Sequence, residues 1–203
     1  AGGVTTMRGL SELTRPFALA DLKERHHPAL WRAREQARLQ TASKDQGRPL
    51  YELLDPRDAE GGLPPNRGLS ALPPPSPDDI FFDIEGDPFA FDEGLEYLWG
   101  VVEPSVADAD GRPTYHQTWA LTKVAEKVAF ERFIDFVVGR RAADPGLHVY
   151  HYGSYERGRV ARMSTRHATR ELEVDELLRA GVFVDLFSAF RQGVLASVES
   201  YSI

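Results

Sequence analysis

The sequence predicts an α/β domain, a mixed sheet flanked by helices, preceded by a small helical segment and a Pro/Gly-rich linker. From residue 80 onward, short apolar runs with strand character alternate with amphipathic helical patterns, which favours helices packed on the faces of a sheet. Hydrophobic residues make up 42% of the chain, enough for a core. Most of the 14 prolines fall before residue 80, which separates a linker from the domain.

Residues 1–54 form the predicted helical connecting segment. Thr5 and Thr6 are candidate N-caps of a first helix, and a charged second helix is predicted from about Pro28 to Gln40. Between residues 22 and 48, seven Lys/Arg residues face three Asp/Glu residues. This basic stretch is either a solvated helix face or a helical module that contacts phosphates.

Residues 55–79 are rich in Pro, Gly, Asp and Ser, which predicts an extended linker. The remaining residues, 80–203, form the predicted α/β domain. Its expected strands are 80–85, 95–103, 115–121, 147–151 and 182–186, and its expected helices are 123–140, with Gly139 marking the end, 155–166, 171–180 and 187–196.

Two acids on the first predicted strand are the strongest candidates for chemistry. Side chains alternate faces along a strand, so Asp83 and Glu85 point one way while Phe82 and Ile84 point the other. Two carboxylates on one face of an apolar strand are costly to bury unless a divalent metal compensates them, and Mg²⁺ or Mn²⁺ prefers such oxygen ligands. The alternative is that both acids lie at the end of the strand in water.

A second candidate segment follows the fourth predicted strand. Glu156 opens a helix at the carboxyl end of that strand, where α/β sheets place their sites. On this helix and just beyond it, four arginines recur at spacings of three and four residues, either as an exposed stripe or as phosphate-binding groups; they are Arg159, Arg162, Arg166 and Arg170. Asp185, on the last strand, is expected to be a supporting residue or a helix cap.

Composition excludes several classes of protein. The chain has no cysteine, so thiolate zinc sites, disulfides and cysteine nucleophiles are absent. No Ser/His/Asp arrangement, P-loop or GxGxxG motif is present. No apolar stretch approaches the ~18 residues of a membrane span, and we expect a cytoplasmic protein. The net charge of −7 limits nucleic-acid contact to local basic patches.

These segments resemble a known group of enzymes. FFDIEGDPF (81–89) resembles the first motif of DEDD-superfamily exonucleases, a D-x-E on the first strand of an RNase H-like sheet. HYGSYE (151–156) resembles the second motif, which usually ends in Asp. With LEYLWGV, VDLFSAFRQ and SYSI, they are similar to the RNase H-like domain of bacterial RecB-family nuclease/helicase fusion proteins. The opening AGGVTTMRGLSEL is similar to the connecting region of those proteins.

The resemblance implies an RNase H-like, metal-dependent nuclease domain. Asp83, Glu85 and Glu156 would be catalytic metal ligands in a two-metal mechanism with Mg²⁺ or Mn²⁺, and the reaction would be 3′–5′ exonuclease-type hydrolysis, with DNA favoured as substrate. The family's fourth carboxylate is expected in a Y-x-x-x-D or H-x-x-x-x-D element, which residues 186–203 do not contain. We therefore expect the domain to be incomplete at its C-terminus and this fragment alone to be inactive.

The resemblance also implies partners and alternatives. In the full-length chain we expect RecB-like nuclease and helicase modules and a role in DNA repair. One alternative is a catalytically inactive nucleic-acid-binding module between those modules, which the Glu at position 156 favours. The other is a structural spacer in which Asp83 and Glu85 are only solvated.

Overall fold

The computed structural model describes residues 4–14, 23, 26–54 and 67–202, and these fall into two compact units. The sheet unit comprises residues 72–188. The terminal unit takes its described residues from 1–71 and 189–203. The domain boundaries predicted at residues 54 and 79 stay a prediction.

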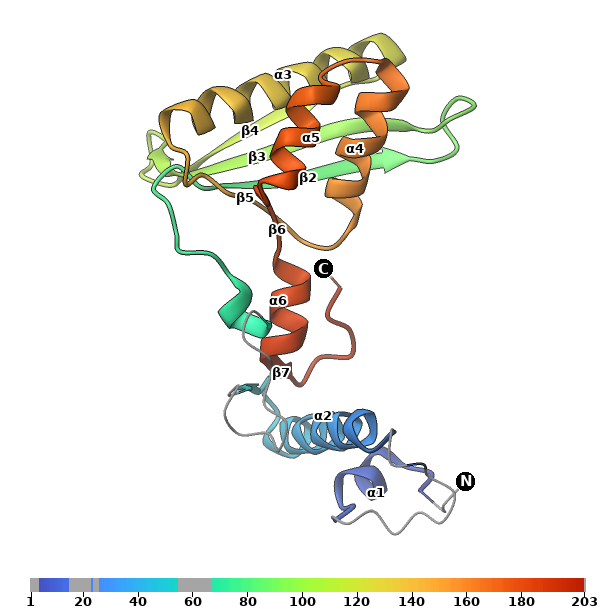
Figure 1. Ribbon diagram of the computed structural model, residues 1–203. Coiled ribbons are helices and arrows are strands. Elements are labelled where there is room, and N and C mark those ends of the chain that lie inside the picture. Colours follow the sequence, from blue (N-terminus) through green and yellow to red (C-terminus); the bar gives the residue numbers. More distant parts are fainter. Residues whose placement is uncertain (1–3, 15–22, 24–25, 55–66, 203) are drawn as a thin grey trace. The chain divides into compact units, whose positions relative to one another are not determined.

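The sheet unit is built on five strands in the spatial order β4-β3-β2-β5-β6 (Figure 1). Neighbouring strands among β2, β3 and β4 run antiparallel, whereas β5 runs parallel to β2 and to β6. This arrangement confirms the predicted mixed sheet. In chain order the elements are β2 (Ile80–Asp87), β3 (Leu95–Ala107), β4 (Pro113–Trp119), α3 (Lys123–Ala143), β5 (Val149–His151), α4 (Tyr155–His167), α5 (Glu171–Arg179), β6 (Phe183–Asp185) and the start of α6 (Leu186–Gly193).

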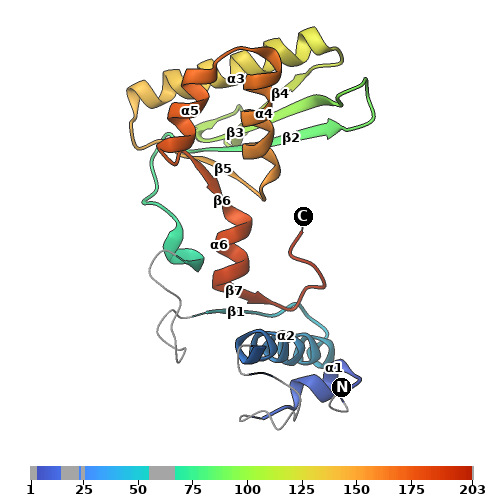
Figure 2. The same ribbon diagram turned by 45° about the vertical axis from the view of Figure 1, so that its right-hand side comes forward.

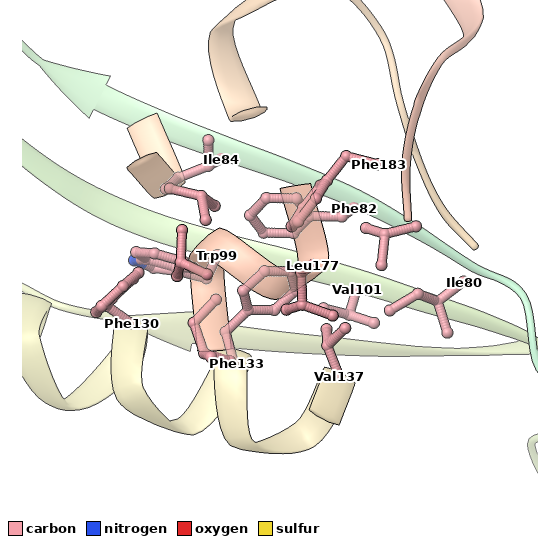
Figure 3. Packing of buried hydrophobic residues seen from close by; sticks show 14 of the residues in the cluster. Ile80, Phe82, Ile84, Trp99, Val101, Phe130, Phe133, Val137, Leu177 and Phe183 are labelled. Atoms are coloured by element: carbon pink, nitrogen blue, oxygen red, sulfur yellow. The ribbon is translucent and has the colours of Figure 1, made fainter. Parts of the chain in front are cut away.

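Helices α3, α4 and α5 lie on the same side of the sheet in both ribbon views (Figures 1 and 2). The core is therefore a layer between one face of the sheet and these helices. Figure 3 shows its aromatic centre, where the rings of Phe82 and Phe133 stack with centroids 4.0 Å apart and Trp99 packs against Phe133 at 5.7 Å. Large buried aromatic side chains of this kind dominate the energetics of a core.

Residues within and just before helix α3 explain why it forms. Thr122 Oγ1 accepts a hydrogen bond from the backbone N–H of Ala125 at 3.2 Å, which caps the N-terminus. A buried stripe at helical spacing then faces the sheet: Phe130, Phe133, Ile134 and Val137. The prediction that Gly139 ends this helix is wrong, because α3 continues to Ala143. Packing of the stripe outweighs the roughly 1 kcal/mol that a helical glycine costs.

The terminal unit contains the remaining elements: α1 (Met7–Ser11), α2 (His27–Gln46), β1 (Tyr51–Leu53), the 3-10 turn η2 (Gly68–Ala71) and β7 (Val194–Ala196). Thr6 caps α1 as predicted, accepting from Gly9 N at 3.0 Å. The predicted helix over 187–196 is wrong in its last three residues, which form β7 and pair antiparallel with β1. Of the predicted linker, residues 55–66 lie outside the described residues.

The basic stretch of the terminal unit is partly neutralised within the chain. Arg38 pairs with Glu35 at 2.8 Å and also with Glu52, and Arg34 contacts Glu35. Residues 22, 24 and 25 of the stretch lie outside the described residues. Phosphate contact by α2 stays a prediction.

Candidate functional site

Asp83 and Glu85 share one face of β2, as the strand period predicts. Burial alternates along the strand, with Ile80, Phe82 and Ile84 inside and the two acids exposed. Neither carboxylate forms a hydrogen bond or ion pair with another described residue. Because both are exposed, the expected burial cost does not arise. They are two unneutralised oxygen donors on the face of β2 opposite the helices.

Aromatic side chains lie on the same face of the sheet as Asp83. Gly100 is the partner of Asp83 on β3, and a Cβ at Gly100 would lie 3.1 Å from the Oη of Tyr115, so the tyrosine ring occupies the space that a side chain would fill. Phe81, two residues before Asp83, packs against Tyr150 with centroids 5.5 Å apart. Burial, together with Asp79, raises the pKa of Tyr150. Asp83 therefore shares its face of the sheet with Phe81 of β2 and Tyr115 of β4.

Glu156 lies on the helix-covered side of the sheet. It lies on the same buried side of α4 as Val160 and Met163, which pack in the core. Only 4% of Glu156 is exposed. Its Oε2 is 3.2 Å from His151 Nδ1, while the buried His151 Nε2 has no partner among the described residues. Across those residues, no group of three Asp, Glu or His side chains is arranged to hold a metal. The structure thus brings Asp83 and Glu85 together but not Glu156.

The four predicted phosphate-binding arginines do not form one free stripe. Helix α4 ends at His167, and Ala168 then adopts a left-handed conformation with φ 47°, so Arg170 lies beyond the helix. Arg162 is exposed and makes no ion pair with a described residue. The other three neutralise acids of the chain, in the pairs Arg159–Glu96 (3.2 Å), Arg166–Glu126 (3.3 Å) and Arg170–Asp135 (2.6 Å).

Asp185 fixes the loop before α4. Its Oδ1 accepts hydrogen bonds from the backbone N–H of Phe187 at 3.0 Å and of Gly153 at 2.9 Å. The first bond caps the N-terminus of α6, and a helix cap was one of the two roles predicted for Asp185. The second holds Gly153, whose φ of 108° suits a glycine, in the turn between β5 and α4.

A buried acid that the sequence pattern does not reveal is the cross-strand partner of Gly86, the residue after Glu85. Glu96 on β3 is 2% exposed and accepts a hydrogen bond from Tyr155 Oη at 2.9 Å. Burial, with Glu96, raises the pKa of Tyr155. A Cβ at Gly86 would lie 2.1 Å from Glu96 Oε2, and the register of β2 shifts between Glu85 and Gly86. Gly86 thus makes room for Glu96 at the bulge next to the candidate ligand.

A second missed acid, Glu126, has no exposed surface. It accepts a hydrogen bond from Glu96 N at 2.7 Å and pairs with Lys123 at 3.2 Å and His167 at 3.0 Å, in addition to Arg166. Burial acts to raise its pKa, but the Glu96 N–H and the cations outweigh burial, so the pKa of Glu126 is lowered. The spacing of Lys123 and Glu126 along a helix was the only local signal of this cluster.

Comparison with known proteins now identifies the fold family. Residues 80–203 match the family model RNase_H_2, described as RNase_H superfamily. The chain belongs to the RNase H superfamily. No curated protein gives a significant match, and no solved structure does.

Membership of the RNase H superfamily agrees with the mixed five-stranded sheet. The matched segment begins at Ile80, the first residue of β2, and contains Asp83, Glu85, Glu156 and Asp185. The superfamily is one of nuclease-type folds. Within the described part of this chain, no helix is both long and apolar enough to cross a membrane.

Proposed function

We propose that this chain carries a metal-dependent nuclease domain that hydrolyses phosphodiester bonds, with 3′–5′ exonuclease action on DNA. It would act within a larger DNA-processing protein that also holds RecB-like nuclease and helicase modules. Membership of the RNase H superfamily supports the nuclease class and a nucleic-acid substrate. The observation that carries the proposal is the D-x-E pair, Asp83 and Glu85, exposed on one face of the central strand without a neutralising partner.

The donor set suits a hard divalent cation. Two carboxylates two residues apart on a strand offer oxygen ligands to Mg²⁺ or Mn²⁺. Ions held there would supply activation of a water nucleophile and stabilisation of the leaving oxygen. Asp83 and Glu85 would hold the ions, and the rings of Phe81 and Tyr115 would limit how a substrate strand approaches them. Arg162, exposed and unpaired among the described residues, would contact phosphate.

The ligand role of Glu156 stays a prediction. It requires the carboxylate to exchange its contact with His151 for a metal contact, and to leave the covered side of the sheet. This burial favours a second candidate function, a nucleic-acid-binding module without catalysis that connects other modules. In that case Asp83 and Glu85 remain solvated acids.

The test is calorimetric titration with Mn²⁺ followed by incubation with end-labelled single-stranded DNA or RNA. We expect the wild-type chain to take up Mn²⁺ and Asp83→Asn to lose at least tenfold in affinity, because the pair then presents one charged ligand. Asp110→Asn is the matched control, since it removes the same charge from the exposed β3–β4 turn of the same unit.

The outcomes separate the candidates. Cleavage that requires Mn²⁺ and disappears in Asp83→Asn, but not in Asp110→Asn, supports the nuclease. If Glu156→Gln also weakens Mn²⁺ binding, Glu156 is a ligand; unchanged Mn²⁺ affinity limits its role to the pair with His151. Nucleic-acid binding without metal uptake or cleavage contradicts the proposal and supports the binding module.

A further inference from the structure

A cavity of about 290 Å³ lies between α3 and strands β3 and β4 of the sheet unit. It is separate from the D-x-E pair, because it opens on the helix-covered side of the sheet. Its lining residues are Trp99, Val101, Glu103, His116, Thr118, Ala129, Arg132, Phe133 and Phe136. No step of the proposed hydrolysis uses any of them.

The body of the cavity is apolar and aromatic. Trp99 and Phe133 are almost fully buried, and with Phe136 they present ring surfaces rather than polar groups. The volume is at the small end of ligand sites, which commonly span about 300–1,000 Å³. A single flat ring system with one substituent fits a space of this kind, and aromatic walls favour it by stacking.

A buried acceptor provides recognition inside the cavity. Glu103 is 7% exposed; its Oε1 lies 2.6 Å from His116 Nε2, and its Oε2 contacts Arg140 Nη1. Each carboxylate oxygen has a second lone pair, so Glu103 can accept two further hydrogen bonds. Arg140 contacts Glu103 and also pairs with Asp78 at 3.1 Å, and His116 lies on the other carboxylate oxygen. With two basic side chains already at Glu103, neutral N–H donors of a ring suit this position.

A cation provides recognition at the rim. Arg132 is exposed and makes no hydrogen bond or ion pair with a described residue. Its guanidinium is therefore available to an anion, and guanidinium groups bind phosphate in a bidentate geometry. The cavity thus combines an apolar slot, an acceptor for ring N–H groups and a phosphate-binding group.

We propose that this cavity binds a nucleoside monophosphate whose base presents N–H donors, with guanosine monophosphate as the best fit. Guanine carries its N1–H and its 2-amino group on one edge, which matches the two free acceptor positions of Glu103. The base lies against Phe136 and Thr118 at the open side of the cavity, with one edge toward Glu103, and the phosphate meets Arg132. The inference does not depend on the proposed hydrolysis at Asp83.

The test is calorimetric titration of the whole chain with guanosine monophosphate, guanosine and inorganic phosphate as separate probes. We expect saturable binding of the nucleotide, weaker binding of guanosine and none of phosphate alone. Arg132→Gln should weaken nucleotide binding about tenfold and leave guanosine binding unchanged. Arg112→Gln is the control, because Arg112 is an exposed arginine of the sheet unit, lies outside the cavity lining, and its side chain has no partner among the described residues.

A second pair of variants tests the location without disturbing the core. Thr118 is an exposed lining residue on β4, so Thr118→Phe should fill the entrance and abolish binding of nucleotide and nucleoside alike. Gln117→Phe adds the same ring at the neighbouring exposed position, outside the lining, and should bind as the wild type does.

Three results would overturn the inference. These are no saturable heat with guanosine monophosphate at millimolar concentration, equal binding by Thr118→Phe, and loss of nucleotide binding in Asp83→Asn. The last would place the nucleotide at the D-x-E pair. Binding that persists in Asp83→Asn supports the cavity whether or not the chain cleaves nucleic acid.

Discussion

At the scale of single residues, acids of this chain occupy two kinds of environment. Asp83 and Glu85 are exposed and unneutralised, whereas Glu96, Glu126 and Glu156 are buried with hydrogen-bonding or cationic partners. Strand period alone predicted the shared face of the first two. The burial of the others could not be predicted, because their main partners lie on elements distant in the sequence. Glu126, for example, meets Arg166 across 40 positions.

Replacement of Glu126 by Gln should destabilise the sheet unit by about 3 kcal/mol at neutral pH, because it leaves buried cations without their counter-charge. Folding lowers the pKa of Glu126 from its ordinary value of 4.5. The carboxylate therefore stabilises the fold above about pH 4.5, and this contribution disappears as the pH falls through the lower, folded-state pKa.

Urea denaturation of the wild type and Glu126→Gln from pH 7 to pH 3 checks this prediction. The difference in unfolding free energy should shrink on the acid side. Glu176→Gln is the control, because Glu176 is exposed on α5 without a partner among the described residues. A difference that stays constant across this pH range would mean that the charge of Glu126 does not stabilise the fold.

At the scale of elements, strands and helices of the sheet unit followed the predicted order, because each carries its own periodicity and most carry a cap or turn. Prediction from sequence failed for elements whose formation depends on contacts with residues distant in the chain. Strands β1 and β7 have three residues each and are defined only by pairing with one another. Gly139 looked like a helix end but lies in open space within α3.

The bulge in β2 gives an element-scale prediction. Gly86→Ala should destabilise the sheet unit by about 2 kcal/mol or more, since its Cβ would overlap the carboxylate of Glu96. Gly139→Ala should instead stabilise α3 by about 0.5–1 kcal/mol, because nothing lies within 4 Å of the new methyl group. Thermal denaturation of both variants measures these changes, and we expect a lower melting temperature for Gly86→Ala and a higher one for Gly139→Ala. A neutral Gly86→Ala would show that Glu96 does not require this close approach.

At the scale of the whole molecule, the fold class and the RNase H superfamily could be predicted from sequence, and the division into units could not. The last described residues of the family match, 189–202, belong to the terminal unit because β7 pairs with β1. The separation of Glu156 from the D-x-E pair is likewise a property of the sheet as a whole. It depends on which face of the sheet α4 covers. The helical spacing of Glu156, Val160 and Met163 puts these residues on one side of α4, but it does not say which face of the sheet that side meets.

The two units should respond separately to mutation. Leu195 is 1% exposed in the terminal unit, and Leu195→Ala should cost about 2–5 kcal/mol there. Amide hydrogen exchange should accelerate in β1 and β7 while exchange in β2 stays as in the wild type. Phe82→Ala is the reciprocal variant and should accelerate exchange in β2. Equal acceleration in both units after Leu195→Ala would mean that they unfold as one.

The pairing of β1 with β7 also affects the order of events during synthesis. Leu50 N donates to Ser197 Oγ across 147 positions, so β1 leaves the ribosome long before its partner strand exists. At typical elongation rates of about 5–20 residues per second, this delay is on the order of ten seconds. Throughout that interval Tyr51–Leu53 presents an unpaired strand edge, which a second nascent chain can occupy instead. Slow translation would therefore raise the risk of mispairing between chains, while the antiparallel β2–β4 meander can form from neighbouring segments as soon as it emerges.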